Sequence, residues 1–306
     1  MVAFAFIAEE GVLEQQACLL AESIRLFAGA HRNAPILVVS PRSRRRPSKD
    51  TRRRLKALGA RYIELNVRSV APEYGTSFRV HAAAIIERRM RDDVLVFLDS
   101  DMIFAGEPDL SLGDDDVAAR PVDVKGMCTT GDDDPCDAYW RALCRVCGVD
   151  YADIPSITTT ADHEIVKASY NGGFIVARRT AGVFQRTEKF FKRSVAAGML
   201  PWADGAVVQA GHGFVSGRGA RLWGSSQACL SMATWGAGKS VRLLPTSHNF
   251  PAHNSDYVAR AGMKEPLIAV HYHHLFGEDG DMSLHRRLNL PAACHEWLDQ
   301  RLPLHA

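Results

Sequence analysis

Residues 94–104 read VLVFLDSDMIF, and this stretch decides how the rest of the chain is interpreted. Its first five residues have the length and apolar character of a buried strand, and Asp99 and Asp101 follow at once. Side chains alternate along an extended segment, so the two carboxylates can converge while Ser100 points away. Two carboxylates at the end of a buried strand repel each other unless a positive charge lies between them. The stretch therefore predicts a site for a divalent cation, which takes oxygen ligands; the alternative is a solvated turn.

The chain before this stretch alternates between strand patterns and helix patterns. Apolar residues at helical spacing predict the helices, and Ser48 and Gly59 are the expected ends of the second one. The alternation predicts a parallel, doubly wound α/β sheet with right-handed crossovers, in which ligands bind beyond the carboxyl ends of the strands. The expected strands are 3–8, 36–39, 61–65 and 94–98, and the expected helices are 13–27, 48–58 and 78–90.

The regular pattern stops after Asp116. We interpret residues 123–168, which are rich in acidic residues, proline and cysteine, as an inserted, partly helical lobe. Order returns in SYNGGFIVARR (169–179), where an Asn-Gly-Gly turn is expected to precede a strand. Residues 205–219 receive no assignment. Further helices are expected at 183–197, 226–235 and 290–302, and further strands at 241–244 and 268–271.

Composition limits the class of protein. The chain has 306 residues, of which 46% are hydrophobic and 24% charged, and this is ordinary globular composition. No run of about 18 apolar residues predicts a membrane span, and the first residues lack the basic start of a signal peptide. Seven unevenly spaced cysteines favour free thiols in a reducing compartment, so we expect a cytoplasmic protein.

Positive charge is concentrated in one place. The net charge is only +2, yet the segment from Arg42 to Arg54, RSRRRPSKDTRRR, holds eight basic residues against one acidic residue. Such a run can be a patch for phosphates or for a membrane surface. A solvated loop leading into a helix is the preferred interpretation, and peripheral membrane contact stays open.

Several short motifs occur in an order that resembles a known family. They are Asp99-Ser100-Asp101, Asn171-Gly172-Gly173, WGSSQACLSMA (223–233), LLPTSHN ending at Asn249, and IAVHYHHLFG (268–277). In this order they resemble glycosyltransferases of the GT-A fold, and within that fold the glycogenin and bacterial lipopolysaccharide hexosyltransferase family, which is glycosyltransferase family 8-like. The resemblance covers about residues 3–276.

The resemblance implies a fold and an activity. The fold would be a Rossmann-like, doubly wound, mainly parallel sheet with flanking helices and the inserted lobe, in one catalytic domain over 1–306. Residues 1–122 would bind the nucleotide and 169–306 the sugar and acceptor. The implied activity is metal-dependent transfer of a hexose from a nucleoside diphosphate sugar, a UDP-sugar above others, to an unknown acceptor with retention of configuration. No nucleic-acid partner is implied.

The resemblance also assigns roles to single residues. The metal, Mn²⁺ or Mg²⁺, would be held by Asp99, Asp101 and His271, with His273 as the alternate ligand. The other members of the implied site contact the donor or shape its place: Ile7, Ala8 and Glu9 at the uridine, Arg79 and Ser100 near the diphosphate and metal, Asn171, Gly172 and Gly173 at the sugar, and Gln227 beside Ser226. Ser226 stands where the family has an acid, and Asp204 is a nearby acid that can compensate for it.

Other interpretations of the same residues remain. A haloacid-dehalogenase-type phosphatase would use Asp99 as nucleophile and Asp101 as general acid. A protein that binds sugar nucleotides without turnover would explain Ser226, and a polyanion-binding protein would use the basic run. The cysteines 128, 136, 144 and 147 are interpreted as free thiols, with a structural zinc site as the alternative.

Overall fold

The structure is a computed structural model that describes residues 1–210, 213–235, 240–254, 257–258, 265–281 and 283–304. The chain divides into two compact units, and neither is one continuous segment. The first unit comprises Met1–Asn66, Val96–Ser111 and Pro245–Ala306; the second comprises Val67–Leu95 and Leu112–Leu244.

The first unit contains a sheet built from the predicted N-terminal strands. Its strand order is β4-β1-β2-β3, and β2 pairs in parallel with both β1 and β3. These strands are β1 (Val2–Ile7), β2 (Ile36–Ser40), β3 (Ala60–Glu64) and β4 (Val94–Leu98), and the connecting helices are α1 (Val12–Phe27) and α2 (Lys49–Ala57). The Oγ of Ser48 accepts a hydrogen bond from Thr51 N at 3.1 Å, so the predicted cap of α2 is confirmed.

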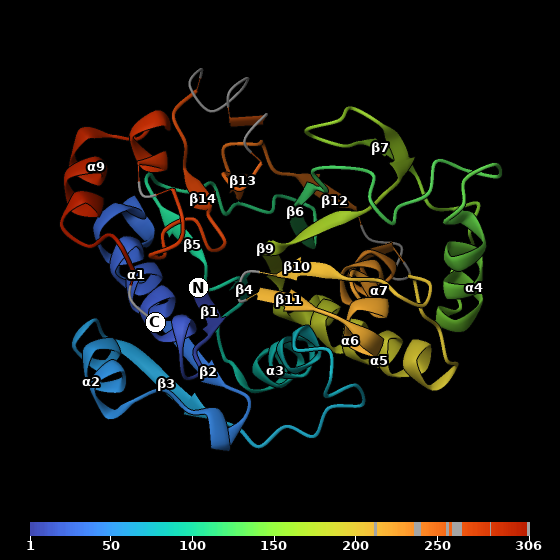
Figure 1. The fold of residues 1–306 in the computed structure, drawn as a ribbon, viewed down its shortest axis with the longest axis horizontal. Helices are drawn as coiled ribbons and strands as arrows, with labels where there is room; N and C mark the ends of the chain where they lie inside the picture. Colours follow the sequence, from blue (N-terminus) through green and yellow to red (C-terminus); the bar gives the residue numbers. More distant parts are fainter. Residues whose placement is uncertain (211–212, 236–239, 255–256, 259–264, 282, 305–306) are drawn as a thin grey trace. The chain divides into compact units, whose positions relative to one another are not determined.

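A small second sheet in the first unit carries part of the candidate site. Its order is β13-β14-β5, formed by Phe250–Pro251, Ala269–His271 and Met102–Phe104. Strands β14 and β5 are antiparallel and place His271 opposite Met102, the residue after Asp101. Helix α9 (Ala292–Asp299) packs near α1, where the ring centroids of Phe27 and Trp297 are 5.4 Å apart (Figure 1).

The second unit combines a short sheet with packed helices. The sheet order is β12-β6-β9, with β12 parallel and β9 antiparallel to β6. Its strands are β6 (Val117–Pro121), β9 (Tyr170–Arg178) and β12 (Val241–Leu243), and the helices that pack together in this unit are α3 (Thr76–Arg89), α5 (Val183–Ala196) and α7 (Ser225–Trp235). Ser231 Oγ of α7 accepts a hydrogen bond from Tyr170 N of β9 at 3.1 Å, which fixes this helix on that strand.

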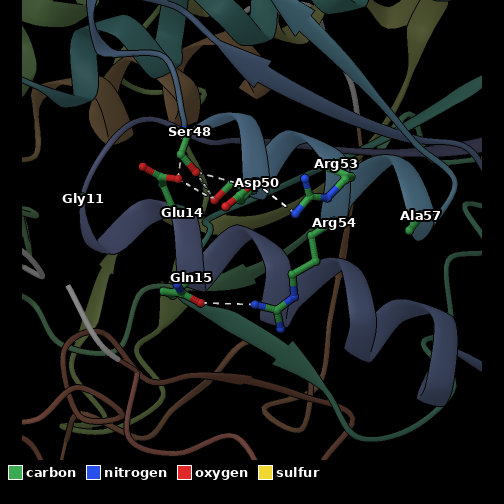
Figure 2. A pocket seen from close by; sticks show the side chains of 9 residues that line it. Gly11, Glu14, Gln15, Ser48, Asp50, Arg53, Arg54 and Ala57 are labelled. Carbon is green, nitrogen blue, oxygen red and sulfur yellow. Dashed lines mark hydrogen bonds and ion pairs between the residues drawn. The ribbon is translucent and has the colours of Figure 1, made fainter.

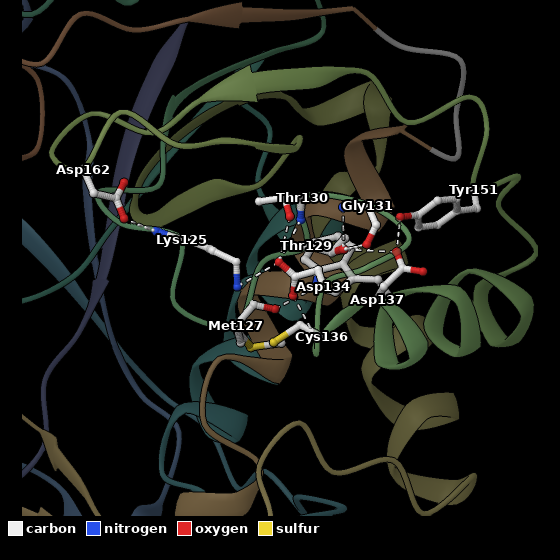
Figure 3. A network of polar contacts seen from close by, with 11 residues as sticks. Lys125, Met127, Thr129, Thr130, Gly131, Asp134, Cys136, Asp137, Tyr151 and Asp162 are labelled. Carbon is white, nitrogen blue, oxygen red and sulfur yellow. Dashed lines mark hydrogen bonds and ion pairs between the residues drawn. The ribbon is translucent and has the colours of Figure 1, made fainter.

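The lobe at 123–168 contains one helix and one small hairpin. These elements are α4 (Asp137–Cys147), β7 (Ser156–Thr158) and β8 (Ile165–Lys167). The buried Asp137 accepts hydrogen bonds from Thr129 at 3.0 Å, from Arg141 at 2.5 Å and from Tyr151 (Figure 3). Asp134 binds Lys125 at 2.9 Å in the same network. Asp134 and Asp137 thus stabilise the lobe's own fold.

Residues 205–219, which had no assignment, contain β10 (Val208–Ala210), β11 (Gly213–Val215) and the start of α6 (Gly217–Arg221). The expected Asn-Gly-Gly turn is wrong, because Asn171, Gly172 and Gly173 lie inside β9. The fold class is confirmed: the chain is mixed α/β, with a large, mainly parallel sheet and flanking helices. Within the described residues, none of the helices has the length and apolar character needed to cross a membrane.

Candidate active site

The carboxylate of Asp101, in the stretch 94–104, lies against a histidine of the first unit. Asp101 follows β4, and the Nε2 of His271, the last residue of β14, is 3.1 Å from Asp101 Oδ1. The same nitrogen is 4.0 Å from Asp99 Oδ2. Tyr272 N donates to Asp101 O at 3.0 Å, which holds the two segments together. The structure therefore brings Asp99, Asp101 and His271 together.

His273 also lies beside His271, although it is outside the strand. The strand ends at His271, and His273 adopts a left-handed conformation with φ 51°. Its ring centroid is nevertheless 4.4 Å from that of His271. Asp101, His271 and His273 each offer one ligand atom within 4.8 Å of the others, and they form the one such trio of His, Cys, Asp or Glu within the described residues.

A third histidine, which the sequence interpretation missed, stacks on His273. The rings of His253 and His273 have centroids 3.8 Å apart and planes 5° from parallel. His253 also lies 5.7 Å from His271, ring to ring. It follows β13 in a segment without a motif, so the sequence alone carried no signal for it.

The electrostatics of the group favour metal-ligating protonation states. Burial acts to raise the pKa of Asp101, but the charge and hydrogen bond of His271 outweigh it and hold that pKa well below its usual value. Burial, followed by the neighbouring His271, lowers the pKa of His273 to about 2. An ionised carboxylate and a neutral imidazole are the forms that bind metal ions. Mixed oxygen and nitrogen donors fit Mn²⁺ and admit Mg²⁺.

The predicted uridine-binding residues lie in the same unit. The Oγ of Ser100, the residue between the two aspartates, donates to Ile7 O at 2.5 Å. Ala8 N donates to Val39 O at 2.9 Å. The buried Glu9 accepts from Arg42 Nε at 2.9 Å. Glu9 thus fixes the start of the basic run on the sheet.

A second group of predicted residues comes together within the second unit. Gly172 is held on both of its backbone polar groups: its N–H donates to Gln227 Oε1 at 3.2 Å, and its carbonyl accepts from Arg79 Nη2. Asn171 Oδ1 accepts from Gly173 N at 2.9 Å. Residues from α3, β9 and α7 therefore meet at one point of this unit.

Two residues that the sequence interpretation missed support Asn171. Asn171 Nδ2 donates to Asp123 Oδ2 at 2.9 Å, and the other oxygen of Asp123 pairs with Arg120 Nη1 at 2.6 Å. Arg120 is fully buried and also donates to Thr160 Oγ1 at 2.7 Å. Its Nε and Nη2 have no hydrogen-bond partner within the described residues. The signal available in the sequence was an arginine inside the apolar run VAARPV.

Ser226 and Asp204 have separate partners. The Oγ of Ser226 is 2.8 Å from the hydroxyl of Tyr74, and both residues are buried. Burial raises the pKa of Tyr74, so its hydroxyl stays protonated. The carboxylate of Asp204 is 87% exposed and pairs with Arg221 at 2.5 Å. The compensation of Ser226 by Asp204 thus stays a prediction.

A surface pocket lies elsewhere in the first unit, at the start of α1 and along α2 (Figure 2). Its polar side chains bind one another: Ser48 N donates to Glu14 Oε2 at 2.9 Å, and Arg54 Nη1 donates to Gln15 Oε1 at 3.3 Å. Arg53 pairs with Asp50 at 3.1 Å. None of the lining residues belongs to the aspartate–histidine group, which consists of Asp99, Asp101, His271 and His273, so we do not assign the active site here.

Comparison with solved structures shows where this fold recurs. The galactosyltransferase LgtC in complex with donor and acceptor sugar analogues is similar over 98% of this chain and 100% of its own, with 14% identity and a TM-score of 0.54. The bifunctional glycosyltransferase WbbM is similar over 98% of this chain and 51% of its own, with 16% identity and a TM-score of 0.54. At these identities the likeness shows the fold alone. Among curated proteins, none matches.

A family model adds sequence-level support. The model described as the Rhodobacterales glycosyltransferase domain matches residues 4–204, about two thirds of the chain. The match includes both aspartates after β4 and the Asn-Gly-Gly segment of β9. The chain therefore belongs to the family of Rhodobacterales glycosyltransferase domains.

Proposed function

We propose that this glycosyltransferase transfers a hexose from a UDP-sugar, depends on a divalent metal ion, and retains the anomeric configuration. The observation that carries the metal dependence is the 3.1 Å contact between Asp101 Oδ1 and His271 Nε2 at the carboxyl end of β4. Ligands of doubly wound sheets bind beyond such strand ends. The nucleotide and the stereochemistry rest on the motif resemblance.

The residues of the first unit would hold the donor's diphosphate through the metal. Asp99, Asp101 and His271 offer two carboxylates and one imidazole, which suit Mn²⁺ or Mg²⁺. When bound, the ion stabilises the negative charge that develops on the leaving diphosphate. The chain's own contribution is to keep Asp101 ionised, which His271 favours, and to place Asp99 4.0 Å from the same imidazole nitrogen.

The residues of the second unit would recognise the donor sugar. Arg79 and Gln227 hold the backbone of Gly172, and a glycine backbone lets a ligand approach closely because it has no side chain. Asn171 carries amide groups that can bind sugar hydroxyls. Arg79 also remains the predicted phosphate contact, since a guanidinium makes charge-assisted hydrogen bonds to phosphates. Asp123, which binds Asn171, joins this set.

With the family shown, the phosphatase interpretation is dropped, since Asp99 as a nucleophile would leave the Asn-Gly-Gly and histidine motifs without a role. Binding of sugar nucleotides without turnover is the interpretation that the experiment below must separate from catalysis. Measuring UDP release from UDP-sugars, with and without candidate acceptors, makes that distinction, because a binder without activity shifts stability but releases no UDP.

The direct test is a thermal-shift panel of UDP, GDP, CMP and TDP, each with and without Mn²⁺. A ligand at about a hundredfold over its Kd stabilises a protein by about 2.7 kcal/mol through mass action. We expect UDP to raise the melting temperature only when metal is present, and Asp101→Asn to abolish the shift. An unchanged melting temperature with every nucleotide, with and without metal, would contradict the proposal.

A further inference from the structure

The aspartate–histidine group contains more nitrogen than a site of two carboxylates and one histidine. Asp101, His271 and His273 lie within reach of one ion, since one ligand atom of each is within 4.8 Å of the others. His253 lies flat against His273, with centroids 3.8 Å apart and planes 5° from parallel. Three imidazoles therefore lie together in the first unit, and one of them, that of His271, contacts the half-buried carboxylate of Asp101.

The backbone holds His273 in an uncommon position. Its φ of 51° is in the left-handed region, which non-glycine residues seldom occupy. Its carbonyl accepts a hydrogen bond from Gln16 Nε2 at 3.2 Å, and this contact to α1 keeps the turn in place. Residues kept in such conformations cluster at binding and catalytic sites. With this backbone, the ring centroid of His273 lies 4.4 Å from that of His271.

We propose that His273 is a ligand of the metal ion together with Asp101 and His271, and that His253 orients its imidazole by stacking. This inference rests on the metal site of the proposed function and sets its metal preference. Adding a second imidazole to Asp99, Asp101 and His271 favours late first-row ions such as Co²⁺ and Zn²⁺, which accept nitrogen donors readily, over Mg²⁺, which prefers oxygen.

The adjacent residue supplies a matched control. His274 belongs to the same His-rich segment but is exposed, and it is outside the group of metal-ligating side chains within the described residues. His273→Asn and His274→Asn therefore make the same chemical change one residue apart. His253→Phe keeps an aromatic ring for stacking and removes the nitrogens, whereas His253→Ala removes the stack.

The experiment is isothermal titration of chelator-treated, nucleotide-free protein with Zn²⁺, Co²⁺, Mn²⁺ and Mg²⁺. We expect His273→Asn to weaken Zn²⁺ and Co²⁺ binding by about 10- to 100-fold, a range typical of perturbing a metal site, and to change Mg²⁺ binding less. The visible absorption of bound Co²⁺ should change in the same variant. His274→Asn and His253→Phe should bind as the parent does, and His253→Ala should bind more weakly.

Equal affinity of His273→Asn and His274→Asn for all four ions would overturn the inference. Circular dichroism of the metal-free variants verifies that each is folded. The two proposals fail separately. If His273→Asn binds metals as the parent does and UDP with Mn²⁺ still stabilises the protein, the ligand assignment is wrong and the proposed function stands. If the metal affinities fall as expected and no nucleotide binds, the ligand assignment stands and the proposed function is wrong.

Discussion

At the scale of single residues, Arg120 of the second unit is a buried charged side chain with few partners. It is fully buried, it pairs with Asp123 at 2.6 Å, and two of its nitrogens have no hydrogen-bond partner in the described part of the chain. A buried charge is tolerated only with a close partner. Because Asp123 in turn binds Asn171 at 2.9 Å, the pair positions a predicted sugar contact.

We expect Arg120→Met to lower the free energy of unfolding by about 3–5 kcal/mol, because it leaves Asp123 without its cation. The measurement is urea unfolding at pH 7. The double variant Arg120→Met/Asp123→Asn is the control, and it should recover part of the loss since neither charge remains. A double variant that is less stable by the sum of both single losses would show that the pair is not the cause.

Ser226 is the residue at which this chain departs from the motif pattern. Its hydroxyl lies 2.8 Å from that of the buried Tyr74, a neutral donor that can serve a carboxylate equally well. We predict that Ser226→Asp changes the donor preference or the rate, because it adds a charge at the second residue of α7, next to Gln227. The measurement is UDP or other nucleotide release from several sugar nucleotides, with Ser226→Ala as control.

The idea fails if Ser226→Asp matches the parent kinetically with every donor. A general loss of folding would be seen in the melting temperature, and Tyr74→Phe separates that effect because it removes the same hydrogen bond without adding a charge.

At the scale of elements, a hydrogen bond joins α3 to α5 in the second unit. His81 Nδ1 is 2.8 Å from Glu188 Oε1, and Lys192 Nζ is 2.8 Å from the same oxygen. Burial acts to raise the pKa of Glu188, but the hydrogen bonds of His81 and Lys192 outweigh it and lower that pKa to about 2. A depressed carboxylate pKa stabilises the folded state above the unfolded value, about 4.3 for Glu.

The contribution of Glu188 should therefore be complete above about pH 5 and disappear as the pH falls toward 2. We expect Glu188→Gln to destabilise the protein at pH 6 and to lose this effect progressively between about pH 4.3 and pH 2. Urea unfolding at several pH values measures it, with the exposed Glu164→Gln as control. A difference from the parent that is constant with pH would contradict the assignment.

The elements that could be predicted are those whose pattern is local. The helices at 13–27, 78–90 and 183–197 carry their own apolar stripes, and the structure places α1, α3 and α5 there within two residues. The missed strands β5 and β13 are three and two residues long. Such short strands exist only through pairing with distant segments, here with β14. The Asn-Gly-Gly segment was misplaced because Gln227 and Arg79 of other elements keep it extended.

The same distinction holds for the candidate site. Asp99, Asp101 and His271 were found because motif order carries them, and the structure brings them together. His253 and Asp123 were missed because each reaches its partner through tertiary packing alone: the first stacks on His273, and the second binds Arg120 and Asn171. His273 was named as an alternate ligand, but its left-handed backbone could not be foreseen.

At the scale of the whole molecule, several residues of the basic run pair with acids of the first unit. Arg42 binds Glu9, Arg45 binds Glu10 at 3.0 Å, and Arg53 binds Asp50 at 3.1 Å. The two exposed pairs, Arg45–Glu10 and Arg53–Asp50, contribute little stability, about 0–1 kcal/mol each, but all three pairs reduce the field of the run. The pairing favours the solvated-helix interpretation; membrane contact through this run stays a prediction.

The seven cysteines, all free, are distributed over both units. Burial raises the pKa of Cys18 to about 11 and of Cys294 to about 12 in the first unit, and of Cys229 to about 12 in the second. The thiolate is the reactive form, so these thiols should resist alkylation at pH 8 as long as their unit stays folded. We predict that the half-buried Cys136 reacts first with iodoacetamide.

Peptide mass spectrometry after short pulses of iodoacetamide in rising urea measures the order of modification. Modification of Cys18 as early as Cys136, without urea, would contradict the expectation. Cys18 and Cys294 report on one unit and Cys229 on the other, so the native thiols are intrinsic probes of local unfolding. They record which half of the enzyme opens first, and whether a donor with its metal delays that opening, without a single engineered label.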